Sequence, residues 1–296
     1  MTYRRMKWWR ELLLVGVLSV SCTAIASPDP AAILRAKYLL LKEPLQKNQF
    51  MQPLVLESSE TQNHVKGDIY ATVDYSFGAV SAGLNNPDHW CDVMLLHINT
   101  KYCHAVVAPT GTTLVVHIGK KTPEDLADAP RLAFDYSVAA ATPGYFEIIL
   151  NARDGPLGTS DYRILMEAVA LQNGKTFLHL TYSYAINFAG RMAIQTYLGT
   201  IGRSKVGFTV VGKRADGLPD YIGGVRGLIE RNTMRYYLAI DSFIGAERAL
   251  PAAQFEIRLQ NWFTATERYP QQLHEMDRGE YIEMKRAEYL RQQTVQ

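Results

Sequence analysis

The sequence predicts an α+β domain in which a curved antiparallel β-sheet wraps around one long C-terminal helix, with additional helices after it. Three observations predict this class: two short helical segments near residue 80, a following run of segments with alternating polarity, and a long amphipathic helix behind that run. No helix of crossover length separates successive strands, which excludes a doubly wound parallel sheet. Of the 296 residues, 47% are hydrophobic, which is enough for a real core.

Residues 1–26 have the form of a signal peptide. A basic start is followed by an apolar run over residues 12–20 and by the cleavage pattern Ala24-x-Ala26. The apolar stretch is shorter than the ~20 residues that a membrane span needs. We therefore expect cleavage after Ala26 and secretion, into the periplasm of a Gram-negative bacterium. A lipid anchor at Cys22 is a weaker alternative, because Ser19 stands where a lipobox prefers Leu, and a retained helix is another.

Export would change both the net charge of the chain and the oxidation state of its cysteines. The formal net charge is +2, but without the first eleven residues 27 basic side chains face 28 acidic ones. Such a chain has no electrostatic reason to bind nucleic acid. Cys91 and Cys103 remain after cleavage, and thiols oxidise outside the cytoplasm. We expect a Cys91–Cys103 disulfide, with two separate buried thiols as the alternative.

The order of elements begins with residues 27–63, for which we expect a short N-terminal helix and a polar connector. Residues 66–77 alternate as a strand does, and residues 78–94 predict two short helices broken before Pro87. Thr122 and Pro123 predict a short capped helix. Further strands are expected at 95–107, 112–119, 132–141, 145–151, 163–171, 176–187, 192–198 and 206–212.

The long helix is expected at residues 219–244. Gly223, Gly224 and Gly227 share its first turns, at a cost of about 1 kcal/mol each relative to alanine. Such glycines indicate a close approach of the sheet or of a ligand.

Residues 246–296 predict a charged amphipathic helical tail. Its charges alternate in sign, while Phe255, Leu259 and Trp262 form one apolar stripe. We expect this tail to pack on the parent domain, and the alternative is a helix that binds a membrane or protein partner.

Residues 64–245 resemble the START/Bet v 1-like superfamily, also called SRPBCC, in their order of elements. Asn86-Pro87-Asp88-His89-Trp90, which closes the predicted helix pair, is similar to a Pro-x-x-Trp segment often found there. The resemblance implies a helix-grip fold. The superfamily has no shared catalytic signature, so it implies no catalytic residue here. The signal peptide and the charged tail depart from its usual cytosolic members.

Ionisable strand residues give little sign of catalysis. His97 and His104 have opposite parity on their strand, and no metal-ligand motif is present, so we expect neither a metal nor a cofactor. Arg163, Glu167 and His179 fall on the strand face opposite the apolar residues. We expect them to form charge pairs across strands on a solvated face rather than an acid–base site.

Strand parity instead predicts an apolar cavity between the sheet and the long helix. Its predicted lining consists of Trp90, Phe134, Tyr136, Ile148, Met166, Leu180, Tyr182, Tyr184, Met192, Ile229, Thr233 and Tyr236. A solid core is the alternative, because protein interiors normally pack without large voids. The tyrosine hydroxyls favour a ligand pocket, which combines apolar walls with a few polar groups.

Three functions from different classes are compatible with these features. The first is a non-catalytic exported carrier that binds a lipid or another hydrophobic small molecule in the internal cavity. The alternatives are a cyclase- or hydrolase-like enzyme on the same fold and an interaction scaffold that acts through the tail. Export favours the carrier, because cyclisations linked to acyl carriers or coenzymes are cytosolic.

Overall fold

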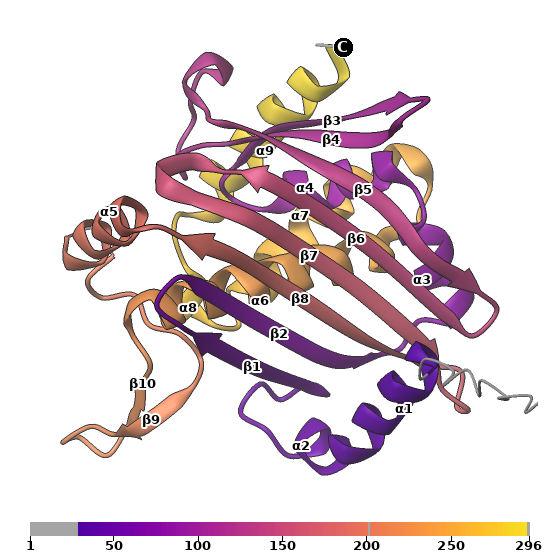
Figure 1. Ribbon diagram of the computed structural model, residues 1–296, viewed down its shortest axis with the longest axis horizontal. Coiled ribbons are helices and arrows are strands. Elements are labelled where there is room, and N and C mark those ends of the chain that lie inside the picture. The colour runs from indigo at the N-terminus through magenta and orange to yellow at the C-terminus, as the bar shows by residue number, and fades with distance from the viewer. Residues whose placement is uncertain (1–28, 201, 295–296) are drawn as a thin grey trace, which may run out of the picture.

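The computed structural model describes residues 29–200 and 202–294, so the signal-peptide prediction lies outside the described part of the chain (Figure 1). Within that part, the main sheet has eight strands in the order β1-β2-β8-β7-β6-β5-β4-β3, and all neighbours are antiparallel. Its strands are β1 (Leu54–Glu60), β2 (His64–Val73), β3 (Thr100–Ala108), β4 (Gly111–Ile118), β5 (Arg131–Thr142), β6 (Tyr145–Asp154), β7 (Thr159–Ala170) and β8 (Thr176–Ile186).

Helices cover both faces of this sheet. The long helix α6 (Gly224–Ala246) lies against β1, β2 and β8, and α3 (Phe77–Leu84) and α4 (Pro87–Leu96) lie beside it. The predicted helix-grip class is therefore confirmed. On the other face, α1 (Pro30–Leu40) and α2 (Lys42–Gln46) form a second, smaller core with outward-facing strand residues such as Tyr70 and Phe177.

Capping and a covalent bond fix the position of α4. The Asn86 side chain accepts a hydrogen bond from the backbone N–H of Asp88 at 2.9 Å, and Pro87 occupies the first turn. The indole of Trp90 donates to the carbonyl of Leu84 at 2.8 Å. A Cys91–Cys103 disulfide joins α4 to β3, which confirms the predicted pairing.

Glycines mark the places where α6 approaches its neighbours. A Cβ added at Gly67 on β2 would collide with the side chain of Thr233 on α6. A Cβ added at Gly227 would lie 2.8 Å from the carbonyl oxygen of Ile222 and 3.0 Å from the nitrogen of Gly207. The glycine at the start of α6 therefore accommodates a crossing segment of this chain, rather than leaving space for a ligand.

The tail packs on the parent domain in two places: its first two helices lie against α6, and its last helix lies against α4 and the edge strand β3. It contains α7 (Pro251–Thr266), α8 (Pro270–Leu273) and α9 (Arg278–Thr294). Trp262 on α7 is 2% exposed, donates to the carbonyl of Arg235 at 3.2 Å, and stacks on Tyr281 of α9. The tail is thus packed on the parent domain, and Trp262 of the predicted apolar stripe anchors it.

Three sequence predictions about local structure are wrong at the edges of the sheet. The connector before residue 63 contains β1, an edge strand whose polar second half hides its pattern. Residues 192–198 belong to the helix α5 (Phe188–Gly199), because Asn187 caps it by accepting from the N–H of Gly190 at 2.8 Å. Residues 219–221 pair with β9 (Val210–Lys213) as β10 (Pro219–Tyr221), so the long helix begins later.

The helix expected after Thr122 is also replaced by a different structure. Only a short 3₁₀ turn forms, at Leu126–Asp128. The carbonyl of Thr122 accepts instead from the ammonium of Lys101 at 3.0 Å, and the carboxylate of Glu124 accepts from the N–H of Lys120 at 2.8 Å. These contacts hold the segment as a loop.

Candidate ligand-binding site

The predicted lining residues meet in the interior, with one exception. Met192 lies on α5 and is 49% exposed, so it is removed from the set; the alternation that suggested a strand there belongs to a helix. Tyr136 is partly buried against the core, and Thr233 is buried and donates to the carbonyl of Ile229. The remaining members belong to one hydrophobic core: Trp90, Phe134, Ile148, Met166, Leu180, Tyr182, Tyr184, Ile229 and Tyr236.

Tyrosines gather at one end of this interior, where β7 and β8 face α6. The rings of Tyr162 and Tyr184 are stacked 5.0 Å apart, and those of Tyr182 and Tyr236 are also 5.0 Å apart. The hydroxyl of Tyr162 bonds with the Thr159 hydroxyl at 2.8 Å, whereas those of Tyr182, Tyr184 and Tyr236 form no hydrogen bond with any described residue. The interior therefore carries hydroxyl groups that can still bind an acceptor or a donor.

Tyr136, on β5, also has a hydroxyl group without a hydrogen-bond partner among the described residues. Its hydroxyl oxygen is buried. Burial raises the pKa of this hydroxyl to about 12, so it stays protonated and keeps a proton to donate. Leaving such a group unsatisfied costs about 1–3 kcal/mol.

A cationic cluster lies near the tyrosines and combines residues of α6 with residues from the loops at 121 and 205 and from the segment after α8. Glu275, which follows α8, accepts from Arg235 at 2.6 Å and pairs with Lys121 at 2.8 Å and Lys205 at 3.3 Å. Burial alone would raise the pKa of Glu275, but the charges of Arg235 and Lys121 hold it below its usual value. Arg231, one turn before Arg235, shares this environment. We call Lys121, Lys205, Arg231, Arg235 and Glu275 the cationic cluster.

His97 connects the cationic cluster to the tyrosines. Its ring stacks on Tyr236 with centroids 4.7 Å apart, at the C-terminal end of α4. Burial, and then the positive charges of Arg235 and Lys285, keep the pKa of His97 well below its ordinary value, so the ring is neutral. Its Nδ1 accepts from the N–H of Asn99 at 3.3 Å, which leaves the proton on Nε2. That buried Nε2–H has no partner among the described residues.

Sequence reasoning missed both His97 and the two arginines of α6. His97 was expected within a strand, whereas it caps a helix and turns inward. Arg231 and Arg235 are spaced four residues apart on the amphipathic helix, where charges are normally solvated. Glu275, which pairs with Arg235, stands 40 residues further on, and no local pattern predicts that contact.

The opposite face of the sheet contains the ionisable strand residues. His179 lies between two carboxylates, with Nδ1 at 2.7 Å from Glu167 and Nε2 at 2.8 Å from Asp68. Its ring stacks on Tyr70, beneath α1 and α2. Glu167 and His179 therefore face away from the tyrosines as predicted, but His179 is buried rather than solvated, because the N-terminal helices cover it. Arg163 remains on the rim, hydrogen-bonded to Asn151.

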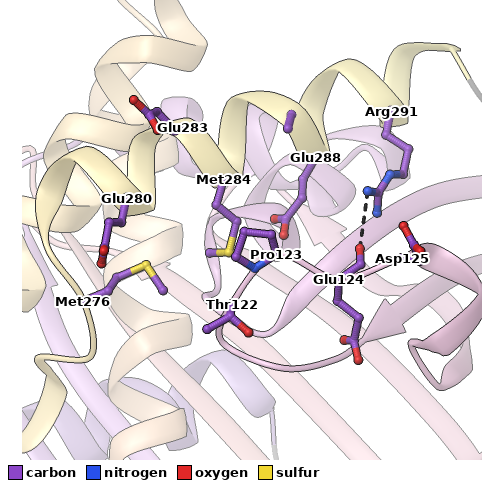
Figure 2. Close-up of a pocket in the computed structure, with 11 residues that line it drawn as sticks. Thr122, Pro123, Glu124, Asp125, Met276, Glu280, Glu283, Met284, Glu288 and Arg291 are labelled. Atoms are coloured by element: carbon purple, nitrogen blue, oxygen red, sulfur yellow. Dashed lines mark hydrogen bonds between the residues drawn. The ribbon is translucent and has the colours of Figure 1, made fainter.

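Surface pockets lie outside the interior in the described part of the chain, and Figure 2 shows the one beside α9. This pocket has a volume of about 690 Å³ between the loop at residues 122–125 and the last helix. Met276 and Met284 contribute apolar atoms, while most ionisable side chains around them are acidic. Arg291 donates across the pocket to the carbonyl of Glu124 at 3.4 Å. We call this pocket the acidic groove, and its charge disfavours anionic ligands.

Metal ligation and membrane insertion find no support in the described part of the chain. No group of three or more His, Cys, Asp or Glu side chains there could hold a metal ion. None of its helices combines the length and the apolar character needed to cross a membrane.

Comparison with solved structures finds similar backbone arrangements. Norcoclaurine synthase from Thalictrum flavum is 12% identical with a TM-score of 0.34, over 49% of this chain and 91% of that one. Human StAR-related lipid transfer protein 5 is 8% identical with a TM-score of 0.31, over 57% and 87%. The Zhui aromatase/cyclase from Streptomyces sp. R1128 is 11% identical with a TM-score of 0.31, over 71% and 94%.

Comparison with protein-family models and with curated protein sequences finds no match. The similarity to the solved structures is one of architecture, and at these identities neither a ligand nor a reaction follows from it. The function must therefore be inferred from the interior itself.

Proposed function

We propose that this protein is an exported carrier that binds a hydrophobic small molecule, of lipid type, between the sheet and α6. The observation that carries the proposal is the set of unsatisfied polar groups in an otherwise apolar interior. The hydroxyl of Tyr136 and the Nε2–H of His97 are buried without partners among the described residues. A bound molecule with a few polar atoms would satisfy them, and apolar walls with a few polar groups are typical of ligand sites.

The entry route in this proposal passes α5. This helix follows β8 at the end of the sheet where the tyrosines lie, and Gly190 is its one buried residue. Phe188 on α5 is 81% exposed. The other contacts of α5 with the rest of the chain include the partly buried Ile194 and Leu198 and an ion pair from Arg191 to Glu60. Displacement of this short helix would expose the tyrosines and admit the ligand. Binding would then consist of reversible burial, without chemical change.

The enzyme alternative has one supporting observation, the neutral and buried His97. A general base needs a free acceptor nitrogen near the substrate. The Nδ1 of His97 already accepts from the backbone of Asn99, and its Nε2 carries the proton. His97 is thus arranged to donate a hydrogen bond, which suits ligand binding better than proton abstraction.

The proposal is tested by expressing the full chain with export and analysing the protein gently purified from the periplasm. Intact mass should show a chain that begins at Ser27, and native mass spectrometry should show a bound small molecule in a 1:1 ratio. Organic extracts should release a lipid that is absent from a second exported protein purified by the same steps. A protein that carries no molecule and binds no fatty-acid or sterol probe would refute the carrier function.

A further inference from the structure

Beyond the carrier function, we propose that the bound molecule is an amphipath with an anionic group, a carboxylate or a phosphate monoester, and that Arg231 holds this group. This inference rests on the proposed function and specifies its ligand class. It starts from the charges around α6. Four cations of the cationic cluster face the single carboxylate of Glu275, which already pairs with three of them.

Arg231 is the cation of the cluster that forms no ion pair with Glu275, although the charges of Glu275 and Glu230 act on it from a distance. Its side chain is almost completely buried, yet it forms no ion pair with any described residue. Its guanidinium donates one hydrogen bond, from Nη1 to the carbonyl of Val206 at 3.2 Å. A guanidinium has five N–H donors, so most of those of Arg231 have no acceptor among the described residues. Burial, and then the charge of Arg235, lower the pKa of Arg231 to about 10, which still leaves it cationic at neutral pH.

Glu230, the nearest alternative partner on α6, is occupied elsewhere. Its carboxylate accepts from the backbone N–H groups of Phe208 and Thr209, at 2.6 and 2.9 Å, and from the hydroxyl of Ser58 at 2.5 Å. These bonds fix the segment after Val206 to α6. Glu230 therefore organises the backbone around Arg231, and its charge acts on the guanidinium without an ion pair between them.

Two further buried donors belong to Arg235, one turn after Arg231, and to His97, on which the charges of Arg235 and Lys121 act. The Nε of Arg235 and the Nε2 of His97 are buried and unpaired among the described residues. Arg231 also acts electrostatically on Tyr184 at the end of the interior. A site surrounded by N–H donors and cations suits a ligand that supplies acceptors and negative charge. The apolar part of the same molecule would lie among the tyrosines, which are adjacent to His97.

The test uses the mature chain, residues 27–296, with the disulfide intact. Displacement of fluorescent cis-parinaric acid would measure the affinities of dodecanoic acid, dodecyl phosphate, dodecanol and dodecyltrimethylammonium. The variants are Arg231→Gln and, as a matched control on the same helix, Arg226→Gln, whose Nε donates to the partly exposed Ser58. Thermal melting would show that each variant is folded.

We expect an anionic compound to bind at least tenfold more tightly than dodecanol, and Arg231→Gln to weaken its binding about 10- to 100-fold, the range of a hydrogen bond to a charged group. Arg226→Gln should bind as the wild type does. The tighter of the acid and the phosphate identifies the head group. Equal binding of dodecanol and both anions by the wild type, a comparison that needs no variant, would overturn the inference and leave the carrier function intact. If none of the four compounds bound, both this inference and the proposed carrier function would be refuted.

Discussion

Glu288 joins α9 to the sheet domain, and replacing it would measure how far the tail belongs to the fold. Its carboxylate lies 2.9 Å from the ammonium of Lys101 on β3 and 2.7 Å from that of Lys285 on α9. Both lysines are completely buried. Glu288→Gln keeps the shape but removes the charge, which leaves two buried ammonium groups without a counter-ion. Removing one partner of a buried pair costs about 3–5 kcal/mol.

The hydrogen bonds that both lysines keep in Glu288→Gln limit the loss of unfolding free energy to that range. Lys285 still donates to the carbonyls of His97 and Thr100, at 2.7 and 2.8 Å, and Lys101 to that of Thr122. Burial, only partly offset by Glu288, already lowers the pKa of Lys285 to about 8, so this lysine can lose its proton in the variant at modest cost.

Chemical denaturation followed by circular dichroism would measure the change. A loss of 3–5 kcal/mol corresponds to a Tm lower by roughly 6–20 °C for a chain of this size. Glu283→Gln is the matched control, because Glu283 is exposed on the same helix, and its free energy of unfolding should change by less than about 0.5 kcal/mol. If Glu288→Gln cost less than about 1 kcal/mol, the tail would be peripheral and the reasoning from burial would be wrong.

Two further changes probe the two polar regions of the sheet. Burial alone would lower the pKa of His179, but the hydrogen bonds that its protonated ring donates to Asp68 and Glu167 raise it above 6.5. The contribution of protonated His179 to the free energy of unfolding is therefore complete below about pH 6.5 and is lost as the pH rises through the folded-state pKa. The difference in unfolding free energy between the wild type and His179→Gln should thus be larger at about pH 5.5 than at about pH 9. A difference that grows with pH would contradict this. Tyr136→Phe removes an unsatisfied hydroxyl and should leave stability unchanged or higher by about 1 kcal/mol, whereas Tyr162→Phe breaks a bond and should lose about 1 kcal/mol. Equal losses in the two variants would show that the Tyr136 hydroxyl has a partner.

The sequence was sufficient to predict the sheet and its inward face, because both depend on local alternation. Leu180, Tyr182 and Tyr184 alternate on β8, and the structure buries all three on the α6 side. The same rule failed at Met192, where polarity alternates within a capped helix. Periodicity cannot distinguish these cases when the capping contact is a single side chain.

The polar half of the site could not be predicted, because it depends on contacts between distant parts of the chain. Arg231 is an ordinary basic residue in the helical pattern, and its burial follows from the segment at residues 206–209 that crosses α6. Arg235 is buried because the chain returns after α7 and places Glu275 beside it. Composition and spacing contain no signal of such encounters.

Photolabelling tests the central claim, that the ligand lies in the interior, most directly. The mature protein would be irradiated with a fatty acid that carries a diazirine in the middle of its chain, and the labelled peptides would be mapped by mass spectrometry. The account predicts labels on β7, β8 and α6, around Tyr182 and Tyr236, that disappear with excess unlabelled fatty acid. Labels confined to the acidic groove, on α9 and the loop at residues 122–125, would contradict it.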